Sequence, residues 1–146
     1  MILQDNKLSS TIPTTFGQLG KLQALSLGSN KLTGIIPSEI GRLLGLGESE
    51  YLYFLGSHCK FNLTVIFVTT TVTLSLYDND LTGTIPVELE RLVNLNSLYL
   101  DNTLLEPTIP TGMCDLGALK DFWADCDELG GCDCCTTCCI DDVVCL

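Results

Sequence analysis

Basic side chains are scarce in this sequence of 146 residues. Seven Lys and Arg stand against 18 Asp and Glu, which gives a formal net charge of −11. Nucleic acids and anionic lipid surfaces are themselves negatively charged, so such a chain would be repelled by both. We therefore expect no nucleic-acid partner.

Long hydrophobic runs and a leader are also missing. The most apolar stretch, residues 61–77, is uncharged but rich in Thr, and it is shorter than the roughly 20 residues of a membrane-spanning helix. Residues 1–8 show no basic region followed by an apolar stretch, so no secretory signal is visible. We expect no membrane span in this chain, and we expect any signal peptide to lie upstream of Met1.

Groups that carry catalysis are few. The chain has one His, His58, and we find no nucleophile with a neighbouring base and no phosphate-binding glycine loop. The acidic residues near the C-terminus do not follow the ligand spacing of a calcium loop. The sequence predicts a protein that is not an enzyme and that has no cofactor and no metal.

What the sequence does contain is one pattern in four copies. The second copy reads Leu25-x-Leu27-x-x-Asn30-x-Leu32-x-Gly34-x-Ile36-Pro37, followed by Ile40, Leu43 and Leu46. The matching residues are Leu3, Asn6, Leu8, Ile12, Pro13, Phe16, Leu19 and Leu22 in the first copy; Leu74, Leu76, Asn79, Leu81, Gly83, Ile85, Pro86, Leu89, Leu92 and Leu95 in the third; and Leu98, Leu100, Leu105, Ile109, Pro110, Met113, Leu116 and Leu119 in the fourth. Leu76 and Leu100 are 24 residues apart, and a fixed period of this length is typical of a leucine-rich repeat.

The alternation of Leu25 and Leu27 predicts a short strand whose inner face is apolar. Ser26 and Gly28 would then face outward. No single unit could bury its apolar face alone, so the core must come from stacking about three or more repeats.

A structural ladder is expected from Asn6, Asn30 and Asn79, because an Asn side chain can bend the chain and bond the backbone of neighbouring turns. Gly34 suits a sharp turn, and Pro37 fixes φ where the return segment begins. The end copies depart from the pattern: Ser10 stands in place of the turn Gly, and Thr103 and Pro107 stand in place of Asn and Gly. We expect the ladder to be weakest there.

The segments Thr33-Gly34-Ile35-Ile36-Pro37 and Thr82-Gly83-Thr84-Ile85-Pro86 resemble the plant-type leucine-rich repeat of receptor-kinase ectodomains and secreted inhibitor proteins. The resemblance covers residues 1–46 and 73–122. It implies an α/β solenoid of about four short parallel strands, with irregular or 3-10 return segments and a disulfide-rich C-terminal cap.

Residues 47–72 do not fit the repeat, because Leu27 and Leu76 are 49 residues apart, one period plus 25. We hypothesise that the segment is a translated intron. Its first codons can contain GTGAGT, its last can end an intron with AG, and its removal restores the register in frame. A surface insertion and a degenerate repeat are the alternatives.

The predicted organisation therefore has four parts. They are N-terminally truncated repeats over 1–46, the insertion over 47–72, further repeats over 73–122 and a cysteine-rich cap over 123–146. Met1 stands where the first Leu of a strand belongs, and from this we expect repeats upstream.

Eight of the nine cysteines lie outside the insertion: Cys114, Cys126, Cys132, Cys134, Cys135, Cys138, Cys139 and Cys145. A solenoid end needs a cap, and a short tail with little core can be held by disulfides, which implies an oxidising compartment. This tail resembles the terminal cap of leucine-rich-repeat proteins of diatom-type algae. The alternative is a thiolate metal site, since closely spaced cysteines also suit zinc or copper(I).

The outward side chains of the strands would form a concave binding face. The candidate ligand-binding residues are Ser26, Ser75, Tyr77, Asp78, Tyr99 and Asp101. Tyr77 and Tyr99 supply contact area at low entropic cost, and the Asp residues can hydrogen-bond a ligand. The alternative is that these residues only decorate a solvated strand face.

We therefore predict a non-catalytic scaffold that is extracellular or at the cell surface and binds a protein, peptide or glycan. Two alternatives are a C-terminal remnant of a larger leucine-rich-repeat receptor or receptor-like kinase ectodomain, and a metal-binding cysteine tail on a repeat stub.

Overall fold

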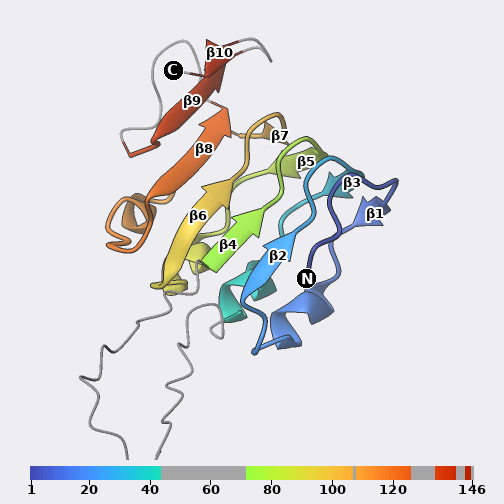
Figure 1. Ribbon diagram of the computed structural model, residues 1–146, viewed down its shortest axis with the longest axis horizontal. Coiled ribbons are helices and arrows are strands. Elements are labelled where there is room, and N and C mark those ends of the chain that lie inside the picture. Colours follow the sequence, from blue (N-terminus) through green and yellow to red (C-terminus); the bar gives the residue numbers. More distant parts are fainter. Residues whose placement is uncertain (44–71, 107, 126–133, 141–143, 146) are drawn as a thin grey trace, which may run out of the picture.

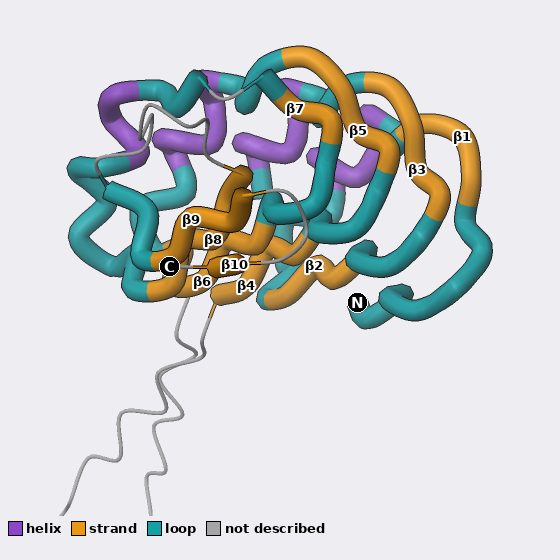
Figure 2. The backbone as a smooth tube through the Cα atoms, turned by 90° about the horizontal axis from the view of Figure 1, so that it is seen from above, coloured by secondary structure: helices purple, strands orange, loops and turns teal. Residues whose placement is uncertain are grey.

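The computed structural model describes residues 1–43, 72–106, 108–125, 134–140 and 144–145. The backbone of these residues winds into successive coils stacked along one axis (Figure 1). The coils place strands on one side, further strands on a second side and helical turns on a third (Figure 2). Apart from Val72, the predicted insertion lies outside the described residues.

The first sheet joins strands from successive coils. Its members are β2 (Ala24–Ser26), β4 (Val72–Ser75), β6 (Leu95–Tyr99), β8 (Asp121–Asp125), β9 (Thr137–Ile140) and β10 (Val144–Cys145). All neighbours are parallel except β9 and β10. Leu25, Leu74, Leu98 and Phe122 pair in turn across the sheet, so the same repeat position recurs at the same height. The prediction of short parallel strands is confirmed.

β4 pairs directly with β2, and Leu74 lies beside Leu25. β4 is therefore the next strand of the sheet after β2. β4 begins at Val72, one residue before the predicted repeat boundary, and the Val72 side chain is 1% exposed. The core position that opens this strand is thus filled by the last residue of the predicted insertion.

A second sheet was not predicted. It consists of β1 (Ser9–Thr11), β3 (Lys31–Gly34), β5 (Asp80–Gly83) and β7 (Leu104–Leu105), all parallel. Sequence reasoning expected irregular return segments here. Because the coils repeat, these extended residues come side by side and their backbone groups pair. Gly34 and Gly83 have positive φ of 78° and 79°, and Ser10 adopts the same conformation at 78°.

The return segments contain 3-10 helices, as predicted. These are η1 (Thr14–Gln18), η2 (Ser38–Arg42), η3 (Val87–Arg91) and η4 (Thr111–Met113). Each follows a proline in an extended conformation, with φ between −57° and −66°. Within the described ranges no α-helix occurs, and each return segment contains one short 3-10 helix.

The core lies between the two sheets and the 3-10 helices. It is built mainly from the Leu and Ile positions of the repeat, and Leu25, Leu43, Leu74, Leu98 and Phe122 are 0% exposed. Burying such side chains contributes about 1.5–3 kcal/mol each relative to leaving them in water. The repeat period therefore identified the core.

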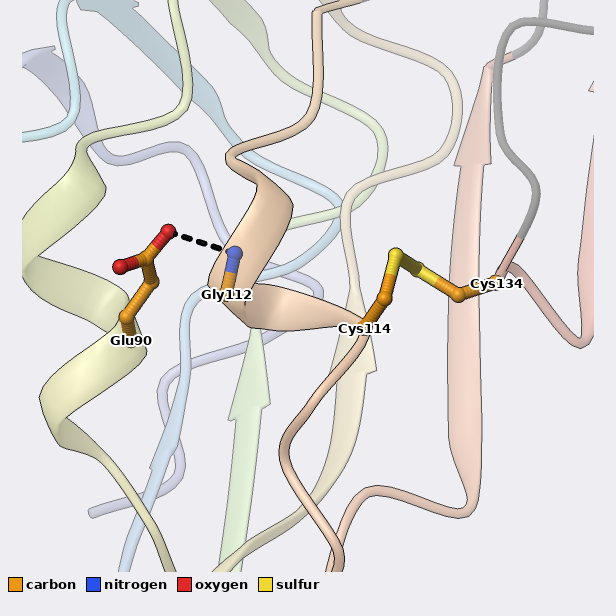
Figure 3. Close-up of a disulfide and its surroundings, with 4 residues drawn as sticks. All are labelled: Glu90, Gly112, Cys114 and Cys134. Carbon is orange, nitrogen blue, oxygen red and sulfur yellow. Dashed lines mark hydrogen bonds between the residues drawn. A yellow bond between two sulfur atoms is a disulfide. The ribbon is translucent and has the colours of Figure 1, made fainter.

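The strands of the C-terminal cap continue the first sheet, and a disulfide links the cap to the last repeat. Cys114, which follows η4, is bonded to Cys134, which precedes β9 (Figure 3). Cys135 is also disulfide-bonded, and the Phe122 N–H donates to Thr136 Oγ1 at 2.8 Å.

The disulfide prediction is confirmed for Cys114, Cys134 and Cys135; for the other five cysteines it stays a prediction. A disulfide sulfur is not a thiolate, so the metal-binding alternative loses these three ligands. Among the described residues no group of three or more His, Cys, Asp or Glu is placed to hold a metal ion, and no helix in these ranges is long and apolar enough to span a membrane.

Candidate functional site

One column of outward side chains crosses the first sheet at a constant repeat position. Ser26 pairs with Ser75, Ser75 with Tyr99, and Tyr99 with Trp123. The side chains therefore grow from hydroxymethyl groups to aromatic rings toward the cap. Because neighbouring strands bring these positions side by side, the change in size makes the surface uneven.

This unevenness forms a groove of about 500 Å³ on the outer face of the first sheet. Its lining residues are Ile2, Gln4, Ala24, Ser26, Thr73, Ser75, Tyr77, Tyr99, Asp101 and Trp123. The groove is open above the small side chains, and the rings of Tyr77, Tyr99 and Trp123 border it. We call this feature the strand-face groove.

The aromatic residues of the groove have defined positions. The Tyr99 and Trp123 rings meet edge to face, with centroids 5.6 Å apart and an interplanar angle of 74°, an arrangement that aromatic pairs favour. Tyr77 lies over Gly28, and a Cβ at that glycine would overlap the Tyr77 ring. Gly28 is thus buried, because the Tyr77 ring of the next coil covers the position that was predicted to face outward.

The two serines predicted to face a ligand line the groove but are largely covered. Ser26 is 8% exposed and Ser75 is 4% exposed. Ser26 Oγ also donates to Gln4 Oε1 at 2.8 Å, so the first coil occupies part of its surface. These serines form the floor of the groove and leave the contact area to the larger side chains.

Asp101 borders the groove, and one oxygen of its carboxylate lacks a hydrogen-bond partner. Its Oδ1 is shielded from solvent and accepts no hydrogen bond. Burial raises the pKa of Asp101 above its ordinary value of 3.8, and the negative charges of Asp125 and Asp78 raise it further, while a backbone hydrogen bond opposes them. An acid without compensation is costly to keep in a partly buried place.

The other two carboxylates of this edge are engaged. Asp125 accepts the N–H groups of Asn102 at 2.8 Å and Thr103 at 2.9 Å. Asp78 Oδ1 accepts from Asn102 Nδ2 at 2.9 Å. Asp78 is exposed and does not line the groove, so the structure sets this predicted residue beside the groove and gives it a bond to the next coil.

The Asn residues of the ladder hold neighbouring coils together. Asn79 is 7% exposed; its Oδ1 accepts from Leu32 N, and its Nδ2 donates to Leu27 O. Asn30 makes the corresponding bonds to the coil of Leu8. Asn6 is exposed and its side chain donates only within its own coil.

The fourth repeat copy, which has Thr103 in place of this Asn, forms different hydrogen bonds. Thr103 Oγ1 donates to Leu100 O at 2.9 Å, and the carboxylate of Asp125 accepts the backbone N–H groups that follow the strand. The Asp125 carboxylate thus takes the place of the next coil's backbone carbonyls, which accept the equivalent N–H groups of Ser29 and Asn30.

Replacing Asp101 by Asn should raise thermal stability at neutral pH. The folded-state pKa of Asp101 lies above 3.8, so the folded chain keeps this proton at pH values where the unfolded chain has lost it. Stability is therefore lost as pH rises from about 3.8 through the raised pKa. Melting curves should show a higher Tm for Asp101→Asn at pH 7 and no difference below pH 3.8.

The matched control is Asp80→Asn, which removes the same charge from an exposed position on β5 and should leave Tm nearly unchanged. If Asp101→Asn lowers Tm at neutral pH, the carboxylate stabilises the fold and is not a strained group.

A second groove, of about 470 Å³, lies between β1, β3 and the helical turns. Its residues include Thr11, Ile35 and Pro86, with Glu39 as the only charged side chain of its lining and no aromatic ring. It therefore lacks the combination of rings and an unpartnered charge found in the strand-face groove.

Sequence reasoning missed Trp123, which is 36% exposed and lines the groove beside Tyr99. The signal was available, because Trp123 lies 24 residues after Tyr99, one period on. We had assigned this residue to the cap, whereas β8 continues the sheet across that boundary. Gln4 and Ile2 were missed because the strand of the first coil is reduced to a single bridge.

Comparison with known proteins gives a consistent result. The Leucine Rich Repeat family matches residues 21–43 and 70–92, and no curated protein matches the chain. The chain is similar to the plant peptide hormone receptor RGFR1, solved in complex with RGF2, with 31% identity over 84% of this chain and 16% of the receptor and a TM-score of 0.65.

Two further structures are similar. One is the BIR3–SERK2 complex from Arabidopsis thaliana, with 31% identity, coverage of 78% of this chain and 48% of that chain, and a TM-score of 0.55. The other is PEPR1–AtPEP1, with 27% identity, coverage of 86% and 15%, and a TM-score of 0.65. The chain spans between 15% and 48% of the length of these three structures.

The stacked parallel strands, the Asn ladder and these likenesses define the chain as a leucine-rich-repeat solenoid. Its repeats are similar to those of plant leucine-rich-repeat receptors, as the Gly-x-Ile-Pro element predicted.

Proposed function

We propose that this chain is a non-catalytic binding scaffold that takes a peptide or a protein segment in the strand-face groove. The observation that carries the proposal is the meeting of Tyr77, Tyr99 and Trp123 around one hollow. Aromatic side chains with one exposed face supply large contact area at low entropic cost, and they dominate binding hot spots.

The similar structures support a peptide or protein ligand over a glycan. RGFR1 is a peptide hormone receptor in complex with RGF2, and BIR3 was solved in complex with SERK2. Other similar structures are receptor ectodomains, and the disulfides of the cap suit an oxidising compartment. We therefore place the protein outside the cell or at its surface. That the chain is part of a larger receptor remains a prediction.

The test uses a display library of random linear peptides selected on the whole chain. Trp123 is the only tryptophan, so its fluorescence reports directly whether a selected peptide reaches the groove. We expect selected peptides to change this emission. We expect Tyr99→Ser to weaken the binding of these peptides roughly thirty-fold, which corresponds to the loss of about 2 kcal/mol that is typical of a hot spot.

Serine is the sharpest substitution because Ser26 and Ser75 occupy the same repeat position, so the fold accepts it there. Val93→Ser, at a residue that is 63% exposed and outside the groove, is the control and should bind as the wild type does. The proposal would be refuted if the selected peptides bound Tyr99→Ser as tightly as the wild type, or if the library yielded no binder.

A further inference from the structure

The acidic end of the strand-face groove indicates what kind of side chain the groove binds, and this inference rests on the proposed function. Three carboxylates lie at this edge, on the coils of β4, β6 and β8. Two of them, Asp78 and Asp125, are satisfied by the amide groups of neighbouring residues. Only Asp101 has an oxygen that is shielded from water and has no partner.

Among the groups of the described residues that act on Asp101, only a backbone hydrogen bond favours its ionised form. The charged groups that act on it, Asp125 and Asp78, are both negative and make its ionised form less favourable. A buried acceptor without a partner lowers stability, and an ionised one lowers it more. A cation in the groove would offset the negative charges around Asp101, and the half-buried Asp101 carboxylate, which lines the groove, would accept a charge-assisted hydrogen bond from it.

The aromatic rings narrow the choice of cation. Tyr77, Tyr99 and Trp123 border the same groove as Asp101. A guanidinium group is planar, stacks on aromatic faces and is more weakly hydrated than an ammonium group, so it suits a site that combines rings with a carboxylate. Cations held over the face of a Trp or Tyr ring are also attracted by the ring itself.

Long-range charge favours the same ligand. The chain carries a formal net charge of −11, and a field of one sign steers an oppositely charged partner toward its site. We infer that the strand-face groove binds an arginine side chain of its peptide ligand, with the guanidinium paired to Asp101 and packed against the rings of Tyr99 and Trp123.

The experiment repeats the library selection on the wild type, on Asp101→Asn and on Asp80→Asn. The wild type and Asp80→Asn should enrich Arg at one fixed position, and Asp101→Asn should not. Asp80 is the control for net charge, because it is exposed on β5 and lies outside the groove.

A matched peptide pair then measures the charge alone. Replacing that Arg by citrulline keeps its shape and hydrogen-bonding end but removes the charge. For the wild type we expect at least roughly ten-fold weaker binding of the citrulline peptide, the factor for about 1.4 kcal/mol. For Asp101→Asn the two peptides should bind within about two-fold of each other, and added salt should weaken only the pairing in the wild type.

The outcomes separate the two proposals. Equal binding of the Arg and citrulline peptides, with sensitivity to Tyr99→Ser retained, would overturn the arginine site and leave the binding groove standing. If neither Asp101→Asn nor Tyr99→Ser changed the affinity of the peptides, both the arginine site and the binding groove would be overturned. The same result follows if neutral sugars on a glycan array bind the groove and no peptide does.

Discussion

Asn79→Ala should destabilise the protein by about 3 kcal/mol or more, because one buried amide connects two coils. The Asn79 side chain accepts from Leu32 N and donates to Leu27 O in the preceding coil, and it donates to Leu76 O and Tyr77 O in its own. Removing it leaves several backbone groups without a partner in a place that water does not reach. Urea denaturation followed by circular dichroism measures the loss.

The matched control is Asn6→Ala. Asn6 has the same repeat position, but its side chain is exposed and donates only to Leu3 O and Gln4 O. Its loss should cost less than about 1 kcal/mol, because water can replace both partners. Equal effects of the two substitutions would show that the Asn side chain acts within its own turn and does not link the coils.

Gly41→Ala should cost about 3 kcal/mol, at the upper end for an overpacked site. Gly41 lies in η2 against the backbone of η3, and a Cβ there would overlap Glu88 O and lie 2.7 Å from Glu88 C. A backbone cannot move aside as a side-chain end can, so the two coils would have to separate. The Tm and the denaturant midpoint should both fall.

Gly20→Ala is the control, since a Cβ at Gly20 would meet no atom within 4 Å. It should change stability by no more than about 1 kcal/mol, in the stabilising direction if the unfolded chain loses entropy. A comparable loss at Gly20 would mean that the effect at Gly41 comes from glycine itself and not from coil packing.

The equivalent position of η3 shows how the spacing is set. Glu90 stands there, four residues after its proline, as Gly41 does in η2. The next helix, η4, is shorter, and Glu90 Oε1 accepts from Gly112 N at 2.9 Å (Figure 3). The Glu90 side chain fits at this position of η3 because the following coil leaves room for it and the Gly112 N–H donates to it.

The candidate site was only partly predictable. Tyr77, Tyr99 and Asp101 follow from alternation along a strand, and the structure places all three at one groove. Trp123 obeys the same period but was assigned to the cap. Asp101 and Asp78 occupy different repeat positions, because Asp101 lies 24 residues after Tyr77 and Asp78 lies 24 residues before Asn102. The sequence does not show that the Asn102 side chain satisfies Asp78 and that Asp101 Oδ1 has no partner.

The period of Leu, Asn and Pro by itself determined that this chain is a solenoid, which residues form its core and where the 3-10 turns begin. It did so because each unit repeats the same local chemistry and can bury its apolar face only against its neighbours. The tertiary structure alone decided the second sheet, the continuation of the first sheet into the cap and the identity of the unpartnered carboxylate. These features depend on which backbone and side-chain groups of different coils come into contact, and the contact distances are set by stacking and not by the sequence of any one coil.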